Sequence, residues 1–150
     1  MKKLLGVLIL IFLVCNISFA DNLKIIDGDT IILNGEKIRF SGIDAPELNQ
    51  TCLQGDQKVN CGIVAKKLLA EKIDKTTIEC IREGKDFYKR TLAECFVNDE
   101  SLSKFLVRNG YAFAYRKYSK KFIKDEDFAK VNKLGIWSMK FQYPWDFRKQ

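Results

Sequence analysis

The sequence predicts a small mixed domain (α+β), an antiparallel barrel with helices packed on it. Its 150 residues are enough for one domain with a hydrophobic core and too few for two. The predicted elements come in the order of three strands, a helix, two strands and further helices, and this order fits such a barrel. No repeat, linker or low-complexity stretch divides the chain. We therefore expect a single folded unit.

The first twenty residues have the pattern of a secretory signal peptide. Two lysines open it, an apolar run spans residues 4–14, and a small-x-small cleavage site ends at Ala20. Because the apolar run is short for a membrane span, a cleaved signal is favoured, and an uncleaved N-terminal membrane anchor is the alternative. We therefore expect residues 1–20 to be removed and the domain of residues 21–150 to be exported, either secreted or periplasmic.

Four cysteines follow the signal segment, an even number that predicts two disulfides in an exported protein. Four cysteines allow three pairings. Cys52–Cys61 would close a short loop and Cys80–Cys95 would join two strands that flank a turn, so this pairing is favoured. A structural zinc site is the alternative. It is disfavoured because the chain has no histidine and no Cys-x-x-Cys spacing.

The chain is basic, with a formal net charge of +7 that includes the two lysines of the signal segment. An exported basic domain suits a polyanion such as nucleic acid, or an anionic surface. Abundant lysine without such a partner would give the same charge. The charge therefore permits a nucleic-acid partner without requiring it.

The domain is expected to begin with a three-stranded unit. Residues 23–27 and 30–33 are rich in Ile and Leu, and Asn34-Gly35 supplies the positive-φ residues of a tight hairpin turn. Residues 36–43 then return as a strand. Its alternation sends Arg39 away from the face that its apolar neighbours build.

The remaining elements follow from hydrophobic spacing and turn residues. Residues 48–60 are polar and are predicted to form an irregular loop held by its cysteines. Apolar residues at helical spacing and terminal glycines mark the later helices. The predicted elements are a helix over 62–73, strands over 76–82 and 91–97 around a turn at 83–86, a helix over 101–109, a strand over 111–115, and a helix over 125–134. The aromatic tail over 143–147 is expected to pack onto the domain.

The most informative run lies between residues 27 and 47. Among its side chains are the carboxylates of Asp29, Asp44 and Glu47 and the guanidinium of Arg39. Carboxylate oxygens are the ligands that a hard cation prefers, and the arginine fork suits phosphate. Such groups are rarely buried without a partner. The run therefore predicts a metal-assisted phosphoryl site.

Three motifs carry a family resemblance. They are Asp-Gly-Asp-Thr at 27–30, Arg-x-x-x-x-Asp-x-Pro-Glu at 39–47 and Asp-x-Tyr-x-Arg at 86–90, and they resemble the signature of the thermonuclease family, the staphylococcal-nuclease-like enzymes. Later segments are similar as well, so the resemblance covers about residues 23–137. It implies a five-stranded oligonucleotide-binding barrel (OB-fold) with three packed helices. It also implies calcium-dependent hydrolysis of DNA and RNA.

The resemblance implies a role for each matched acidic position. Asp29 and Asp44 would bind Ca²⁺ through carboxylate oxygens, and Ala45 would add its backbone carbonyl where the family often has threonine. Carboxylates, a carbonyl and waters together suit a hard cation. Glu47 would be the general base for the attacking water, or would position that water. Without its neighbours, the segment 27–29 would be better explained as an acidic turn.

The matched basic and aromatic positions would hold the substrate. Arg39 and Arg90 match the phosphate-binding arginines of the family, which favour the negative charge of the transition state. A solvated turn residue is the alternative for Arg90, because Lys89 stands where the family usually has glycine. Tyr88 and Tyr118 resemble tyrosines that contact a terminal phosphate and a base. The alternative is a place in the core, where stripes of Phe and Tyr more often lie.

These observations lead to the hypothesis of an exported calcium-dependent endonuclease that acts on DNA and RNA, as a monomer without a protein partner. A non-catalytic nucleic-acid-binding OB-fold protein is one alternative. A disulfide-stabilised surface protein that binds anionic polymers is another. A binding module has no reason to keep Asp29, Asp44 and Glu47, which would repel phosphate. The nuclease is therefore favoured, while the preference between DNA and RNA stays open.

Overall fold

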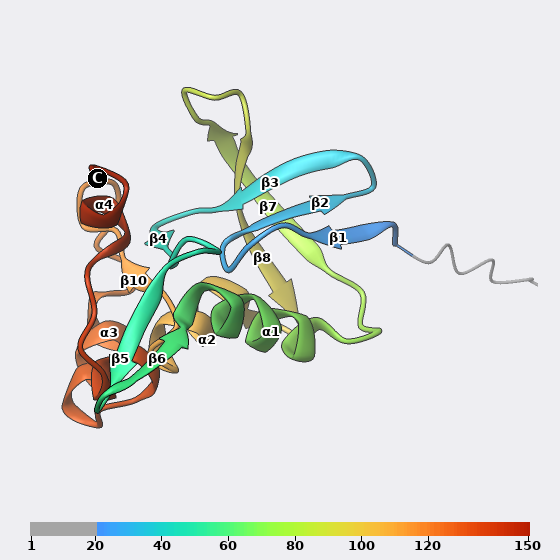
Figure 1. Ribbon diagram of the computed structural model, residues 1–150. Helices are drawn as coiled ribbons and strands as arrows, with labels where there is room; N and C mark the ends of the chain where they lie inside the picture. Colours follow the sequence, from blue (N-terminus) through green and yellow to red (C-terminus); the bar gives the residue numbers. More distant parts are fainter. Residues whose placement is uncertain (1–20) are drawn as a thin grey trace, which may run out of the picture.

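The computed structural model describes residues 21–150 and has the mixed α+β architecture that the sequence predicts (Figure 1). The predicted signal segment, residues 1–20, lies outside the described residues. In chain order the elements are β1 Leu23–Ile25, β2 Thr30–Leu33, β3 Glu36–Phe40, β4 Ile43–Asp44, β5 Thr51–Gln54, β6 Gln57–Asn60, α1 Cys61–Ile73, β7 Glu79–Lys85, β8 Thr91–Val97, β9 Glu100–Ser101, α2 Leu102–Arg108, β10 Phe113–Ala114, α3 Ile123–Val131, the 3₁₀ helix η1 Gly135–Ser138 and α4 Pro144–Phe147.

The main sheet runs in the order β1-β2-β3-β8-β7, and β9 adds to β8. Its neighbours are antiparallel except for β3 and β8, which are parallel. Two further two-stranded sheets pair β4 with β10 and β5 with β6. The predicted α+β class is confirmed and agrees with the OB-fold of the family. The hydrogen bonds do not close the main sheet into a barrel.

The N-terminal hairpin forms as predicted. Asn34 and Gly35 both have positive φ, 51° and 85°, as a tight hairpin turn requires. On β3, Ile38 and Phe40 are almost fully buried in the core. The side chain of Arg39 lies on the opposite face and is 15% exposed. The alternation along β3 therefore places this arginine at a different surface from its neighbours, as the sequence indicates.

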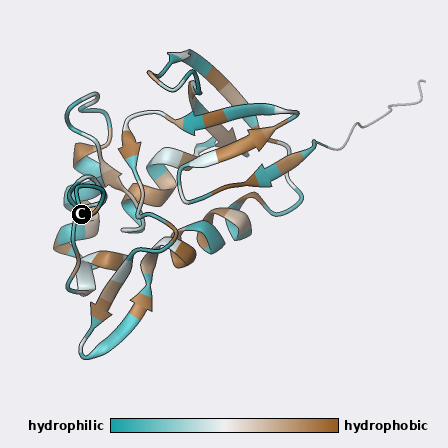
Figure 2. Cartoon of the chain, turned by 45° about the horizontal axis from the view of Figure 1, so that its top comes forward, coloured by the Kyte–Doolittle hydropathy of each residue, from teal (hydrophilic) through white to brown (hydrophobic). Residues whose placement is uncertain are grey.

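Two clusters of apolar side chains form the core. The larger one fills the space between the main sheet and the helices α1 and α2, which lie beneath the sheet in Figure 1. Figure 2 shows hydrophobic and hydrophilic residues alternating along β3, whereas β2 is mostly hydrophobic. The smaller cluster surrounds the fully buried Phe113, whose ring meets the rings of Trp137 and Tyr143 edge-on at 5.3 and 5.1 Å. Such aromatic pairs are worth about 0.5–1.5 kcal/mol each beyond their buried area.

The smaller cluster fixes the C-terminal segment. This segment runs alongside β4 and β10 at the left of Figure 1 and ends in α4. The aromatic tail predicted to pack onto the domain does so, with Trp145 stacked on Tyr143 at 4.6 Å between ring centroids. Within residues 21–150, no helix is long and apolar enough to cross a membrane.

The three predicted helices are confirmed as α1, α2 and α3. Helix α3 begins at Ile123 and ends at Val131, two to three residues nearer the N-terminus than the predicted 125–134. The predicted strand over 111–115 is reduced to the two residues of β10. The helices η1 and α4 were not predicted, because each is only a single short turn.

The polar stretch over residues 48–60 was wrongly predicted as an irregular loop. It contains the β5–β6 hairpin, in which Thr51 pairs with Asn60 and Gln54 with Gln57. Gly55 takes a φ of 62° in its turn. Most side chains of this hairpin are exposed. Their sequence therefore lacks the apolar alternation from which a half-buried strand is recognised.

The turn between β7 and β8 was also placed wrongly. The sequence predicts it at 83–86, but β7 continues to Lys85. The register shifts between Arg82 and Gly84, so Glu83 is the extra residue of a bulge within the strand pair. The chain then turns between Asp86 and Arg90, where the carboxylate of Asp86 accepts the backbone N–H of Arg90 at 2.9 Å. Aspartate closes such turns readily through its side chain. The turn therefore follows Asp86 and is not centred on Gly84.

Both favoured disulfides are confirmed. Cys52–Cys61 ties β5 to the first residue of α1, and Cys80–Cys95 joins directly paired positions of β7 and β8. The Cα atoms are 5.8 and 4.0 Å apart.

We expect the oxidised chain of residues 21–150 to contain no free thiol, because all of its cysteines are paired. Thiol titration of the unfolded protein before and after reduction measures this. Reduction should expose four thiols. Any thiol that reacts before reduction contradicts the two-disulfide arrangement.

Candidate functional site

A partly buried guanidinium, that of Arg39, joins two buried carboxylates where β2, β3 and β4 meet. Arg39 Nη1 donates to Asp29 Oδ1 at 2.5 Å, and Arg39 Nη2 donates to Asp44 Oδ1 at 2.7 Å. The side chains of Asp29 and Asp44 are 4% and 0% exposed. The structure thus brings together three of the predicted site residues. Charge-assisted bonds of this kind are among the strongest in proteins.

Asp29 is held from several directions. Its Oδ2 accepts the backbone N–H of Ala45 at 2.8 Å, and its Oδ1 also accepts the hydroxyl of Thr30 at 3.0 Å. Burial raises the pKa of Asp29 to about 7, Arg39 opposes the rise, and the nearby carboxylates of Asp27 and Asp44 add to it. Desolvation is thus the main penalty on the ionised form of Asp29, and a cation beside Asp29 would favour that form.

Glu47 lies on a loop that its neighbours hold in place. Its side chain is 36% exposed. The buried Gln50 accepts the Glu47 backbone N–H at 3.2 Å and donates its side-chain amide to the carbonyl of Gln142 at 2.7 Å. A Cβ on Gly62 would lie 1.8 Å from the Glu47 carbonyl oxygen, so only glycine fits there. Neither residue was predicted as part of the site: Gln50 lies in the stretch predicted as an irregular loop, and Gly62 was assigned only as the start of a helix.

Arg148 is a further residue of the site that the sequence analysis did not find. Its Nη2 donates to Asp44 Oδ2 at 2.7 Å, and its Nη1 donates to Glu47 Oε1 at 2.8 Å and to Asp44 Oδ1 at 3.2 Å. The hydrogen bond to Asp44 is the largest cause that raises the pKa of Arg148 above its usual value. The only sequence signal for this placement is the aromatic tail just before it.

Arg90 lies on the β7–β8 turn and does not touch the carboxylates that bind Arg39. Its Nε donates to Asp86 Oδ2 at 2.7 Å. Burial acts in the opposite direction, but the hydrogen bonds from Arg90 lower the pKa of Asp86. Lys89 takes a φ of 62°, the left-handed conformation that favours glycine, so the turn keeps a glycine-like backbone despite the lysine. Arg90 also lies 5.5 Å from the ring of Tyr88.

A cavity of about 1210 Å³ connects these groups. This volume exceeds the usual range for a small-molecule site and can hold a segment of a polymer. Asp44 is fully buried and does not line it. The residues from the predicted set that line it are Asp29, Arg39, Ala45, Glu47, Tyr88, Arg90 and Tyr118. The structure therefore gathers the predicted set around one cavity, with the exception of the buried Asp44, which contacts the cavity-lining Arg39.

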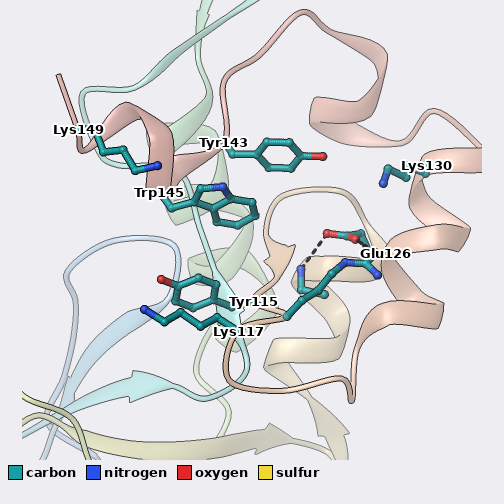
Figure 3. A pocket seen from close by; sticks show the side chains of 9 residues that line it. Tyr115, Lys117, Glu126, Lys130, Tyr143, Trp145 and Lys149 are labelled. Atoms are coloured by element: carbon teal, nitrogen blue, oxygen red, sulfur yellow. Dashed lines mark hydrogen bonds and ion pairs between the residues drawn. The ribbon is translucent and has the colours of Figure 1, made fainter.

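A second cavity, of about 590 Å³, adjoins the first, and Tyr115 lines both. Trp145 lies stacked between Tyr115 and Tyr143 in Figure 3, at 5.6 and 4.6 Å between ring centroids. Across from these rings the buried carboxylate of Glu126 accepts the backbone N–H of Ala114 at 3.0 Å. Lys117, Lys130 and Lys149 surround the opening. Aromatic rings with a basic rim suit a single-stranded polyanion.

The donor atoms at Asp29 and Asp44 are all oxygen, which suits a hard cation such as Ca²⁺. Ala45, whose N–H already touches Asp29, offers a backbone carbonyl in the same segment. Among residues 21–150, no group of three or more His, Cys, Asp or Glu side chains is arranged to hold a metal ion. The residues therefore fit a cation in donor type, and water would have to complete its coordination.

Paired carboxylates and arginines around one cavity of a basic α+β domain are the arrangement of a nuclease, and comparison with known proteins supports this class. A family model described as staphylococcal nuclease homologue matches residues 37–139. An uncharacterized endonuclease from Haemophilus influenzae is 31% identical over 149 residues, which span 91% of this chain and 79% of that protein. A thermonuclease from Staphylococcus intermedius is 32% identical over 125 residues, which span 76% and 73%.

The chain belongs to the staphylococcal nuclease homologue family, and the resemblance predicted from its motifs is confirmed. Nuclease activity on nucleic acids is supported by this membership, and the family is generally metal-dependent. Endonuclease YncB from Bacillus subtilis is 35% identical over 131 residues, which span 77% of this chain and 59% of that protein. The matched range of the family model ends before Arg148.

Proposed function

We propose that the protein is an exported, calcium-dependent endonuclease that hydrolyses phosphodiester bonds of DNA and RNA. The observation that carries this proposal is the buried Asp29–Arg39–Asp44 network, with Glu47 and Arg90 lining the same cavity. A purely binding protein would gain nothing from burying two carboxylates beside the groove that receives phosphate, because each buried charge needs compensation.

The cation would be held by the carboxylates of Asp29 and Asp44 and by the carbonyl of Ala45. When bound, Ca²⁺ would polarise a phosphate oxygen and offset its negative charge. A cation at this place is supported by geometry, because Asp29 and Asp44 both contact Arg39 and their carboxylate oxygens therefore lie close together.

The side chains of the chain itself would perform the remaining steps. Glu47 is exposed enough to meet solvent, and its carboxylate would orient the attacking water and accept its proton. Arg39 would hold a phosphate oxygen from the side of the buried carboxylates, and Arg90 would hold another from the β7–β8 turn. As negative charge develops on the five-coordinate phosphorus, both guanidinium groups would stabilise it.

The substrate strand would lie along the aromatic side chains of the two cavities. Tyr88 and Tyr118 are 76% and 71% exposed, which supports a contact with substrate over a place in the core. Tyr115 lines both cavities, so a strand that leaves the carboxylates could continue past it toward Lys117 and Lys130. A groove of this kind grips unpaired bases by stacking and the backbone by charge.

Export and a monomeric state belong to the same proposal. Two disulfides are typical of proteins in oxidising compartments, and the pattern of residues 1–20 is that of a secretory signal. We propose a secreted or periplasmic enzyme that acts as a monomer.

We expect the chain of residues 21–150 to cleave circular single-stranded DNA and RNA in Ca²⁺, and EDTA to stop the cleavage until excess Ca²⁺ is restored. A closed circle has no end, so its loss measured on a denaturing gel reports internal cleavage. An Asp56→Asn variant, altered in the exposed β5–β6 turn, is the control and should keep full activity. Cleavage that persists in EDTA contradicts the calcium mechanism, and an inactive protein contradicts the nuclease assignment.

A further inference from the structure

The C-terminal arm, residues 142–150, places the guanidinium of Arg148 against two carboxylates. These are Asp44, assigned to the cation, and Glu47, assigned to the water. Arg148 makes two hydrogen bonds to Asp44 and one to Glu47, at 2.7, 3.2 and 2.8 Å. The other cation near Asp44 is Arg39, which donates to Oδ1. Both oxygens of Asp44 are therefore engaged by arginine, and Oδ1 accepts from two of them.

This arrangement conflicts with a cation at Asp44. A carboxylate oxygen has about two lone-pair positions, and Arg148 uses positions on both oxygens of Asp44. A divalent cation that approached the same oxygens would also be repelled by the guanidinium at close range. A cation on this side of Asp44 and the present contacts of Arg148 therefore exclude each other.

The placement of Arg148 is built into the fold. The carbonyl of Gln142 accepts the side-chain amide of the buried Gln50, and Trp145 stacks between Tyr115 and Tyr143 (Figure 3). These contacts anchor the arm just before α4 and within it. The Arg148 side chain is 39% exposed, so it can leave the carboxylates while the arm stays in place.

The adjacent lysine does not share this role. Lys149 has the same charge on the same arm, yet its ammonium pairs with Asp146 at 2.7 Å. No hydrogen bond joins it to the described carboxylates of the site. Arg148 and Lys149 therefore carry the same charge but contact different carboxylates.

We propose that Arg148 is a resident counter-ion of the nuclease site, which competes with the cation for Asp44 and Glu47 and thereby sets the cation affinity. The inference rests on the proposed function, because that function assigns the cation to Asp44. In the free protein the guanidinium holds both carboxylates. When the cation binds, Arg148 releases Asp44 and turns toward the open cavity that it lines.

Calorimetric titration with Ca²⁺ in the absence of nucleic acid tests this inference. The proteins are the chain of residues 21–150, its Arg148→Ala variant and its Lys149→Ala variant. Removing the competing hydrogen bonds should lower the Kd for Ca²⁺ about tenfold or more in Arg148→Ala. Lys149→Ala removes an equal charge from the same arm, so it reports the long-range electrostatic effect alone, which should be less than about threefold in salt.

An Arg148→Lys variant keeps the charge and loses the fork. A lysine can hold only one carboxylate at a time, so its Kd should fall between those of the wild type and Arg148→Ala. Tryptophan fluorescence checks that the arm stays packed in each variant. If Arg148→Ala unpacks the arm, the Lys variant still decides the question.

The inference is overturned if Arg148→Ala binds Ca²⁺ no more tightly than Lys149→Ala, or if none of the proteins binds Ca²⁺. A parallel cleavage assay on the wild type separates the two proposals. Calcium-dependent cleavage with equal Ca²⁺ affinities means that the counter-ion inference fails alone. Absence of both cleavage and binding means that the proposed function fails with it.

Discussion

Replacing Arg39 by Ala is expected to lower kcat by about two to three orders of magnitude, the usual loss when one preorganised donor to a transition state is removed. Arg39 is the only arginine that contacts both Asp29 and Asp44 among the described residues. Its loss also leaves the buried carboxylate of Asp29 without a guanidinium partner, while Asp44 keeps Arg148, and this should destabilise the fold by about 3–5 kcal/mol. Measurements of kcat and of urea unfolding, each in saturating Ca²⁺, follow the two effects.

An Arg39→Lys variant separates charge from geometry. Lysine restores a positive charge between the carboxylates but lacks the planar fork that binds two oxygens at once. We therefore expect it to recover more of the stability than of the rate. Arg82→Ala is the matched control, because Arg82 pairs with Glu36 at the exposed surface of the same sheet and lines neither cavity. A folded Arg39→Ala enzyme with nearly normal kcat would refute the catalytic role.

Replacing Glu47 by Gln is expected to lower kcat by about 10²–10⁴-fold, the range for loss of a general base. The amide keeps the shape of the side chain and can still accept a hydrogen bond from Arg148, but it cannot take a proton. Because the Glu47 side chain is 36% exposed and its loop is held by Gln50 and Gly62, the melting temperature should change little. Steady-state kinetics and circular dichroism measure the two quantities.

Glu83→Gln provides the control for Glu47. Glu83 lines the same cavity, on the β7 side, and pairs with no arginine or lysine of the described chain within salt-bridge distance. It should keep normal kcat. Nearly normal turnover in Glu47→Gln would remove Glu47 from the mechanism. A weakened Ca²⁺ affinity with kcat restored at high Ca²⁺ would instead identify Glu47 as a cation ligand.

The part of the site that the sequence predicts is the part encoded locally. Asp29, Arg39, Asp44 and Glu47 lie within nineteen residues, and the hairpin register and the side-chain alternation of β3 decide which of them meet. Arg148 is 104 residues from Asp44 along the chain. One sequence holds no signal that pairs such distant residues, so this contact appeared only in the folded structure.

The same distinction explains the fold. The N-terminal hairpin and the three main helices were predicted, because a buried face imposes a period on the sequence. The β5–β6 hairpin has no such face and was missed. The β7–β8 turn was misplaced because Gly84 gives a strong turn signal, while the hydrogen bonds of Asp86 place the turn farther along the chain.

The close approach of Gly62 to the Glu47 carbonyl has a consequence for protein engineering. The β5–β6 hairpin just before it is largely exposed and far from crowded, so its turn should accept insertions or a fused tag. Gly62, one residue after the disulfide-bonded Cys61, tolerates no substitution, because not even a methyl group fits there. Libraries that vary the hairpin turn while leaving Cys52 and the first turn of α1 untouched would explore new sequence without displacing the loop of Glu47.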